Sequence, residues 1–157
     1  MKKINEPYPL NDVSEFHETF DLPICPEPLI PSPDRCRLRI NLIEEELEEL
    51  KEAIKDGDII EVADAFCDLQ YVLSGAILEF GLGDRFKALF EEVQRSNMSK
   101  TCKSMDEALA TQLHYEKRDG TVSEIIHRGD EFIVYRKKDG KVLKSVNYSK
   151  ADLTQYL

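Results

Sequence analysis

The sequence lacks the features of several large classes of protein. It has no excess of basic residues: 31 Asp and Glu stand against 21 Lys and Arg, a formal net charge of -10 that argues against a general DNA- or RNA-binding surface. Its first ten residues contain no uninterrupted apolar stretch typical of a signal peptide. It also has no internal repeat and no low-complexity segment. With 157 residues, 41% of them hydrophobic, we expect a single globular domain over residues 1–157.

The sequence also lacks paired cysteines and a clean membrane span. The four cysteines include no C-x-x-C pair, so we expect reduced structural thiols in a cytoplasmic protein, with a disulfide or a zinc site as the less favoured alternative. The most apolar stretch, residues 59–82, is long enough to cross a bilayer but contains four carboxylates, each costly in hydrocarbon. We therefore expect a buried helix there and no membrane partner.

Proline and capping residues divide the chain into expected elements. Five prolines within residues 21–33 exclude a helix, so this segment is expected to form an extended arm. Ser32 and Pro33 suit the first residues of one long helix, and Asp58 suits the N-cap of the next. The expected helices cover residues 12–20, 33–55, 59–80, 84–96 and 105–117.

The last forty residues change character. Branched and aromatic residues gather there in short runs separated by turn sequences, and Asp139-Gly140 is a strong two-residue hairpin signal. We expect a small antiparallel β meander over residues 118–157, appended to a helical core over residues 12–117 that includes the proline-rich arm. The expected fold is mainly α, with a four-helix-type core.

The acidic residues of the first long helix do not all face solvent. On a helical wheel, the apolar residues between positions 38 and 54 form one arc. Glu46 and Glu49 fall inside this arc and Glu45 lies just beyond its edge, whereas the other glutamates of the run point away. A solvated charged face is the usual interpretation of such a run. It does not account for two glutamates, three positions apart, that face the core.

The second long helix repeats this pattern. Glu61, Asp64 and Asp68 follow one another at i, i+3 and i+7, and apolar residues lie on both sides of the row. Such a helix is normally buried, which predicts that protein encloses the carboxylates. A capping box formed with Asp58 is the alternative for Glu61, but it explains neither of the other two acids.

Carboxylates that face one another inside a core repel and lose hydration unless cations neutralise them. A metal cluster resolves this conflict. The three histidines lie outside both helices, so the Glu-x-x-His pattern of di-iron bundles is absent and the candidate ligands are oxygens only. Oxygen ligands with room for water and phosphate favour Mg²⁺, with Mn²⁺ as a substitute, over zinc or iron.

The two acidic segments resemble the signature of the all-α nucleoside triphosphate pyrophosphohydrolases, which include MazG-like and phosphoribosyl-ATP pyrophosphohydrolase-like proteins. The signature is E-x-x-E followed by E-x-x-D, represented here by residues 46–49 and 61–64. Residues 91–100 and 139–153 also resemble later segments of one MazG-like branch, some of whose members act on dUTP or other nucleotides. The two motifs in order, together with these segments, make the resemblance fairly specific.

The resemblance implies a Mg²⁺-dependent enzyme that converts a (deoxy)nucleoside triphosphate to the monophosphate and pyrophosphate, as house-cleaning of nucleotide pools. The implied catalytic residues are Glu46 and Glu45, the latter as a metal ligand or as the base for the attacking water. The implied metal site comprises Glu46, Glu49, Glu61 and Asp64, with Asp68 nearby. Five candidates for substrate contact, each with an ordinary surface position as the alternative, are Arg95, Asn97, Lys100, Lys144 and Tyr148.

Two other functions stay open, namely phosphoribosyl-ATP hydrolysis in histidine synthesis and a catalytically silent helical module that binds a partner. Residues 101–135 form an insertion relative to similar proteins, which leaves the identity of the substrate open. The helix over residues 59–80 carries more apolar surface than a small four-helix unit covers, and the proline-rich arm has the reach to cross a neighbour. We therefore expect a homodimer or a tetramer built from dimers, with residues of two chains at each site.

Overall fold

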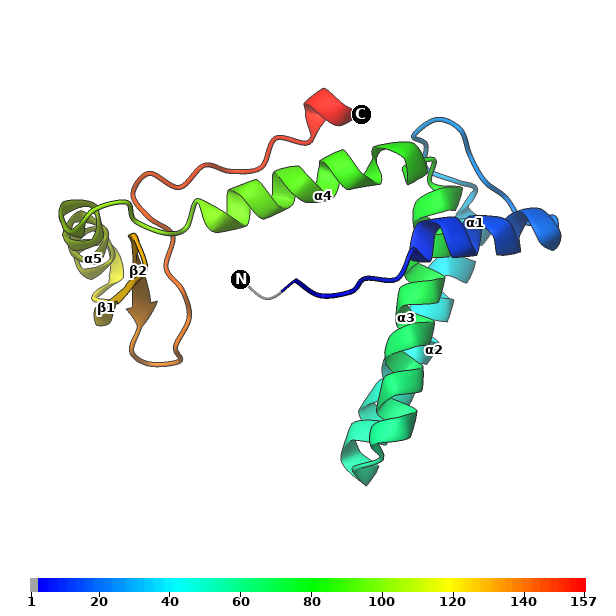
Figure 1. The fold of residues 1–157 in the computed structure, drawn as a ribbon, viewed down its shortest axis with the longest axis horizontal. Coiled ribbons are helices and arrows are strands. Elements are labelled where there is room, and N and C mark those ends of the chain that lie inside the picture. The colour runs from blue at the N-terminus through cyan, green and yellow to red at the C-terminus, as the bar shows by residue number, and fades with distance from the viewer. Residues whose placement is uncertain (1–2) are drawn as a thin grey trace. The chain divides into compact units, whose positions relative to one another are not determined.

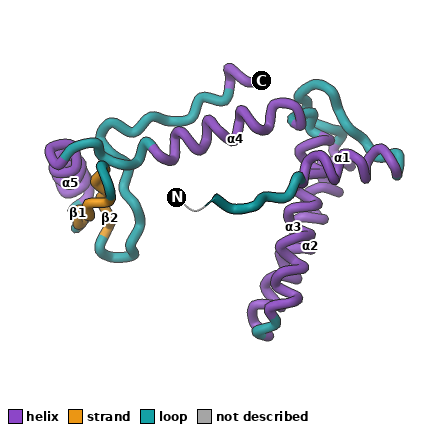
Figure 2. Tube along the Cα trace, viewed as in Figure 1, coloured by secondary structure: helices purple, strands orange, loops and turns teal. Residues whose placement is uncertain are grey.

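The fold comes from a computed structural model that describes residues 3–157 (Figure 1). These residues form five α-helices, one two-stranded antiparallel sheet and a short 3-10 helix at Thr154–Tyr156 (Figure 2). The expected mainly helical fold with a small C-terminal β element is confirmed. Within the described range no single helix is long and apolar enough to cross a membrane. The helices α3 (Ile59–Glu79) and α4 (Gly83–Met98) reach the required length and composition only when they are taken together as a bent pair.

The chain divides into two compact units, Met1–Phe86 and Lys87–Leu157. The first unit contains three complete helices. The hairpin of α2 and α3 is its largest packed element, and α1 packs against α3 (Figure 1). The bounds are α1 Pro9–Thr19, α2 Pro33–Asp56 and α3 Ile59–Glu79.

The two long helices begin and end where the sequence predicts, because their terminal backbone groups find local partners. The Ser32 hydroxyl accepts a hydrogen bond from the Arg35 N–H at 3.4 Å. The Asp58 carboxylate accepts one from the Ile60 N–H at 2.9 Å. Between the helices, Gly57 adopts a φ of 71°, a left-handed conformation that ends α2 without the strain another residue would carry.

The proline-rich arm lies across the C-terminal end of α3 in its own chain. The Cys25 N–H donates to the Leu78 carbonyl at 3.0 Å, and the Leu29 N–H donates to the Phe80 carbonyl at 3.1 Å. These carbonyls belong to the last turn of the helix and its cap, which lack the usual donor four residues ahead, and the Leu78 carbonyl also accepts the Gly81 N–H at 3.1 Å. The arm therefore completes the hydrogen bonding of α3.

The turn after α3 closes against the same arm. Gly81 has a φ of 69°, and a Cβ atom placed on it would lie 1.9 Å from the Glu27 carbonyl oxygen. Only glycine fits this close approach of two backbone segments. Arg85 adds a side-chain contact, because its Nη2 atom lies 2.8 Å from Glu27 Oε2.

A buried ion-pair network joins α1, α2 and α3. Glu79, with 1% of its surface exposed, accepts hydrogen bonds from the guanidinium groups of Arg35 and Arg39. Arg39 Nη2 also lies 3.2 Å from His17 Nε2, and His17 Nδ1 lies 2.9 Å from the Pro23 carbonyl oxygen. A guanidinium only donates and a carbonyl only accepts, so these partners assign the His17 proton to Nδ1.

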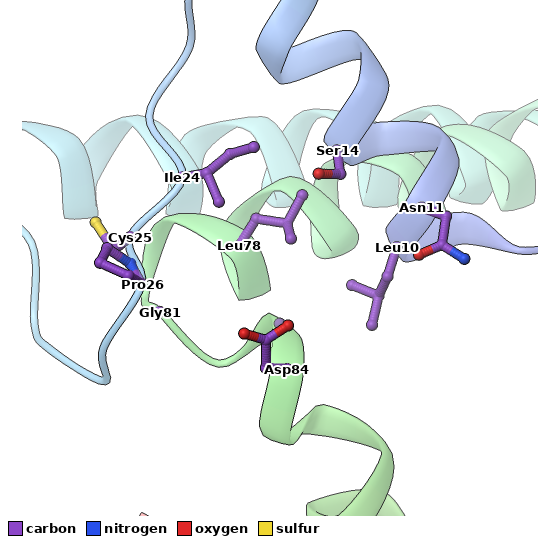
Figure 3. Close-up of a pocket in the computed structure, with 10 residues that line it drawn as sticks. Leu10, Asn11, Ser14, Ile24, Cys25, Pro26, Leu78, Gly81 and Asp84 are labelled. Atoms are coloured by element: carbon purple, nitrogen blue, oxygen red, sulfur yellow. The ribbon is translucent and has the colours of Figure 1, made fainter.

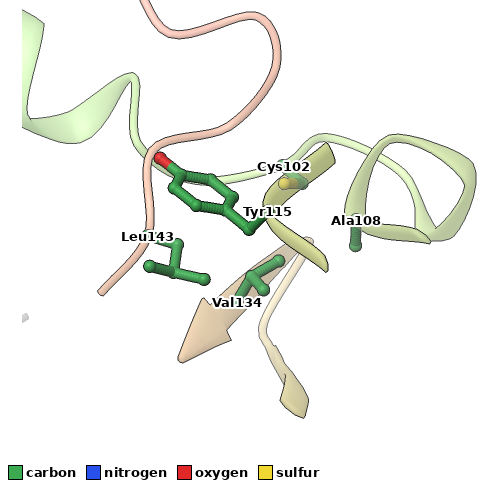
Figure 4. Close-up of a cluster of buried hydrophobic side chains, with 5 residues drawn as sticks. All are labelled: Cys102, Ala108, Tyr115, Val134 and Leu143. Atoms are coloured by element: carbon green, nitrogen blue, oxygen red, sulfur yellow. The ribbon is translucent and has the colours of Figure 1, made fainter. Parts of the chain in front are cut away.

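The second unit has a separate small core. Cys102, Ala108, Tyr115, Val134 and Leu143 pack together between α5 and the sheet (Figure 4). Strands β1 and β2 form a hairpin in which Ile125 lies opposite Val134. The bounds are α4 Gly83–Met98, which begins in the first unit, α5 Met105–Asp119, β1 Ser123–Arg128 and β2 Glu131–Arg136.

The C-terminal β region is shorter than the expected meander. After β2 the described chain forms a turn at Asp139-Gly140 and a single bridge between Tyr135 and Val142, not a third strand. A third strand does not form because the backbone N–H groups that follow are directed to side chains of α5. The Lys144 N–H donates to the Tyr115 hydroxyl at 3.2 Å, and the Val146 N–H donates to the Thr111 hydroxyl at 3.1 Å. These bonds to α5 side chains take the place of a strand ladder.

Candidate functional site

The first unit brings carboxylates from α2 and α3 together around Glu46. This side chain is partly buried, and burial raises its pKa above the ordinary value. The negative charges of Glu49, Asp68, Glu45 and Asp64 raise the pKa further, in that order. All four acids therefore lie close enough to act on Glu46, and five of the six predicted metal or catalytic acids form one cluster.

The sixth acid, Glu61, lies near this cluster at the turn of the α2–α3 hairpin. Glu61 and Glu49 line the same hollow of about 400 Å³, together with Glu52, Asp56 and Asp58. Glu49 is therefore the residue that links the group around Glu46 to the start of α3. The Asp58 carboxylate also accepts the Glu61 N–H at 3.3 Å, so one half of the alternative capping box is present.

The chemistry of these donors fits a magnesium site. In residues 3–157, no three Asp, Glu, His or Cys side chains converge closely enough, as they stand, to chelate one ion. The acids around Glu46 offer carboxylate oxygens only, the ligands that Mg²⁺ and Mn²⁺ prefer. Glu45, Glu49, Glu61 and Asp64 are exposed, so packing does not hold these side chains in a single rotamer. Because Mg²⁺ keeps several of its waters, a few carboxylates suffice.

The single chain does not enclose the acidic row of α3, so the prediction of enclosure from the helical wheel is wrong for one chain. Glu61 and Asp64 are exposed and Asp68 is partly buried. Within the first unit α1 and α2 cover other parts of α3, and the flanking apolar side chains stay uncovered. The large apolar residues of α2 and α3 that remain exposed are Leu38, Ile40, Leu47, Ile54, Ile59, Ile60, Phe66, Tyr71 and Leu73.

The second unit gathers four of the predicted substrate contacts. Lys100 Nζ donates to Asn97 Oδ1 at 2.8 Å, and Lys144 Nζ lies 4.3 Å from the centre of the Tyr148 ring. The Tyr148 hydroxyl lies 3.0 Å from Ser96 Oγ. This hydrogen bond lowers the pKa of Tyr148, and the charges of the two lysines lower it further. The four side chains thus form a polar and cationic surface on one unit.

Arg95, the fifth predicted substrate contact, is engaged by the protein itself. Its Nε and Nη2 atoms each donate to the Glu92 carboxylate at 2.7 Å, and this pairing lowers the pKa of Glu92 to about 2. Its Nη1 atom donates to the Ser149 hydroxyl at 3.0 Å, and Glu92 also accepts the Asp152 N–H at 2.9 Å. Arg95 therefore fixes the C-terminal segment against α4.

A hollow of about 410 Å³ in the second unit contains cations that are not among the five predicted substrate contacts. These cations, Arg118, Arg136 and Lys141, lie with Lys100 and Lys144 around this hollow. The sequence holds one signal for them. Residues 87–157 carry 13 Lys and Arg against 11 Asp and Glu, whereas residues 1–86 carry 8 against 20.

A third hollow, of about 360 Å³, lies between α1, the proline-rich arm and the turn from α3 to α4 (Figure 3). Leu10 and Leu78 line it from α1 and α3, and the Asp84 carboxylate lies at its edge. None of the predicted site residues lines this hollow, so it is distinct from the carboxylate cluster.

The family match lies between α1 and α4 and does not include α5. A family model described as phosphoribosyl-ATP pyrophosphohydrolase matches residues 13–97, which include every predicted metal ligand. The chain is also similar to an uncharacterized protein of Acanthamoeba polyphaga mimivirus, with 30% identity over 93 residues. The aligned part is 59% of this chain and 33% of the viral protein, so the chain spans about a third of that relative's length.

Proposed function

The chain belongs to the phosphoribosyl-ATP pyrophosphohydrolase family of the all-α nucleoside triphosphate pyrophosphohydrolases, and from this premise we propose that it is a Mg²⁺-dependent nucleotide pyrophosphohydrolase. Its proposed reaction converts a (deoxy)nucleoside triphosphate to the monophosphate and pyrophosphate in the cytoplasm, as house-cleaning of nucleotide pools. One observation supports the proposal: Glu45, Glu49, Asp64 and Asp68 lie around the partly buried Glu46, and the mutual repulsion of such carboxylates is relieved when cations bind among them.

In the proposed mechanism, Glu46, Glu49, Glu61 and Asp64 hold the cations, with Asp68 beside them. Bound Mg²⁺ supplies charge neutralisation at the phosphates and a lowered pKa for the attacking water. A carboxylate oxygen of Glu45 binds a metal or accepts the proton of that water. The acidity of the first unit is compatible with an anionic substrate, because the cations it holds carry the attraction.

The second unit carries the other residues that we propose to contact the substrate. Lys100 and Lys144 contact phosphate, and Asn97 contacts the base or the sugar. Tyr148 is positioned by its bond to Ser96 and lies against the Lys144 ammonium. Arg95, whose donors are directed to Glu92 and the C-terminal segment, acts as a positioning residue in this proposal.

A second candidate reaction is the hydrolysis of phosphoribosyl-ATP in histidine synthesis, which the description of the matched family favours. The bond cleaved is of the same kind, a phosphoric anhydride. The two reactions therefore make the same demands on the carboxylate cluster and differ in the group attached to the phosphate chain.

Pyrophosphate release from a panel of substrates tests the function. We expect release from at least one dNTP or NTP in Mg²⁺, and none when EDTA removes the metal, because the carboxylates alone repel the phosphate chain. Release from phosphoribosyl-ATP alone would assign the chain to the second reaction. If no substrate yields pyrophosphate in Mg²⁺, the chain is instead a catalytically silent helical module that binds a partner.

We also propose that two chains pair through the exposed apolar residues of α2 and α3, as a homodimer or as the dimer within a tetramer. Phe66 and Ile60, with 56% and 76% of their surface exposed, flank the acidic row, so pairing would cover the carboxylates that one chain leaves open. Light scattering should give at least twice the mass of one chain.

The substitution Phe66→Ser should shift this assembly toward the monomer. The control Val122→Ser, at a residue of the second unit that is 66% exposed, should not. A monomeric wild-type protein at micromolar concentration would contradict the proposed pairing.

A further inference from the structure

The basic hollow of the second unit is a candidate binding site in its own right. Its lining includes five cationic side chains and lies entirely inside one compact unit, residues 87–157. Arg118 lies near the end of α5, and Arg136 is the last residue of β2. The family match ends at residue 97, so the hollow is built from residues outside the matched region.

The two arginines are held in place by neighbouring acids. Arg118 Nη2 lies 2.5 Å from Asp119 Oδ2, and Arg136 Nη2 lies 2.6 Å from Asp139 Oδ2. Each pairing raises the pKa of the arginine, through a hydrogen bond first. A guanidinium has five N–H donors in a planar fork, so each arginine keeps donors beyond those its acid accepts.

The three lysines of the hollow are not neutralised in this way. In the part of the chain that the structure describes, the ion pairs include none with Lys100, Lys141 or Lys144. Lys100 donates to the neutral amide of Asn97, and Lys144 lies against an aromatic ring. The hollow therefore has more positive charge than its own acids balance.

The wall of the hollow is anchored in the core of the second unit. Tyr115 and Leu143 line the hollow and belong to the buried cluster drawn in Figure 4. The Tyr115 hydroxyl accepts the Lys144 N–H, and the Arg118 guanidinium lies 4.4 Å from the centre of the Tyr115 ring. The backbone of Lys144 and the guanidinium of Arg118 thus contact a residue of the packed core, which favours a preformed site.

We propose that this hollow binds a polyphosphate chain, either free or carried by a nucleotide, without a metal ion. Several cations around one concave surface match a ligand with several phosphate groups, and the guanidinium fork matches the geometry of phosphate oxygens. The site goes beyond the proposed hydrolysis, because Arg118, Arg136 and Lys141 have no role in that reaction. The metal-holding carboxylates belong to Met1–Phe86, although Lys100 and Lys144 serve in both proposals.

Titration of the full-length protein with inorganic tripolyphosphate in EDTA tests this site, because EDTA removes any metal that would recruit phosphate to the carboxylates. Calorimetry should detect binding to the wild-type protein. The substitution Lys141→Glu should weaken it by about tenfold or more, the loss expected for one charge-assisted contact. The matched control is Lys138→Glu, an exposed lysine three positions away that does not line the hollow, and it should change the affinity by less than about twofold at physiological salt.

Three outcomes would overturn the proposal. The first is no binding to wild-type protein in EDTA, and the second is equal weakening by Lys141→Glu and Lys138→Glu, which would indicate a general effect of net charge. The third is a nucleoside monophosphate that binds as tightly as tripolyphosphate. Comparison of tripolyphosphate with a nucleoside triphosphate distinguishes the two sources: equal affinity identifies the free chain as sufficient, and tighter nucleotide binding identifies a contact with the nucleoside. Hydrolysis assays in Mg²⁺ are read separately, because hydrolysis also requires the carboxylates and binding of tripolyphosphate in EDTA does not.

Discussion

Replacing Glu49 with glutamine is expected to reduce Mg²⁺-dependent pyrophosphate release by on the order of a thousandfold, since metal-ion catalysis contributes several kcal/mol to the barrier. Glu49 lies near Glu46 and also lines the hollow that contains Glu61, so its carboxylate connects the two halves of the proposed metal site. An amide keeps the shape of the side chain and removes the negative charge that holds the cation. Steady-state assays with the substrate identified in the panel measure the loss.

The same substitution should leave the fold intact. Glu49 is exposed, and its negative charge raises the pKa of Glu46, so glutamine at this position reduces repulsion in the metal-free protein. Thermal unfolding in EDTA should therefore occur at the same temperature as in the wild type or slightly higher. The stabilisation that Mg²⁺ gives the wild type should be smaller in the variant.

Glu48→Gln is the matched control for Glu49→Gln. Glu48 neighbours Glu49 in the sequence, is exposed and pairs with Lys51 at 2.6 Å on the outer face of α2. Its loss should leave turnover within about twofold of the wild type, because an exposed ion pair contributes little. Full activity of Glu49→Gln would show that the metal site is assigned to the wrong residues.

Replacing Glu79 with alanine is expected to lower the free energy of unfolding by about 3–5 kcal/mol, the usual loss when one partner of a buried ion pair is removed. Both side chains of its pair with Arg39 are buried, with 8% of Arg39 and 2% of Glu79 exposed, so the orphaned guanidinium would keep its charge without water or a counter-ion. Urea denaturation measures the change.

The pH dependence of the pair has a definite sign. Burial raises the pKa of Glu79, but the hydrogen bonds and charges of Arg35 and Arg39 outweigh it and leave the pKa below its ordinary value of 4.5. Stability from this carboxylate is thus fully present above the ordinary pKa and is lost as the pH falls through the lower folded-state value. The Glu79→Ala variant should lack this part of the acid dependence.

Two further variants distinguish the loss of charge pairing at Glu79 from the loss of packing. Arg35→Met should cost less than Glu79→Ala, because the Arg35 side chain is 34% exposed and its ion pair is partly solvated. The double change Glu79→Leu with Arg39→Met replaces the pair by apolar groups and should recover much of the loss. A cost below about 1 kcal/mol for Glu79→Ala would contradict the importance given to the buried pair.

The local features of the fold are predictable from the sequence. Ser32, Gly57 and Asp58 mark helix ends because capping depends on residues a few positions apart. The first helix begins at Pro9 and not at residue 12, since proline is well suited to the first helical position. The Asp-Gly signal at residue 139 marks a real turn, but the path of the chain beyond this turn depends on hydroxyls of α5 that lie about thirty positions away.

In the candidate site too, the sequence predicts the local pattern of residues and not the contacts between distant ones. Glu46 and Glu49 are three positions apart and therefore share one face of α2. Asp64 lies on α3, and the α2–α3 hairpin brings it close to Glu46. The pair of Glu79 with Arg39 joins residues 40 positions apart, and no local pattern marks either partner. The helical wheel also identifies an apolar face without telling what covers it, which is why Phe66 and Leu73 are exposed in one chain.

The proline-rich arm constrains the length of the chain. Prolines have no N–H, so eight of the thirteen residues from 21 to 33 keep a backbone donor, and two of these donors, on Cys25 and Leu29, bond to the end of α3. This pairing cannot survive the insertion or deletion of one residue between them, because either change would shift one donor away from its carbonyl. Residues 26–28 are therefore a spacer of fixed length, in which the number of residues constrains the chain more tightly than their identity.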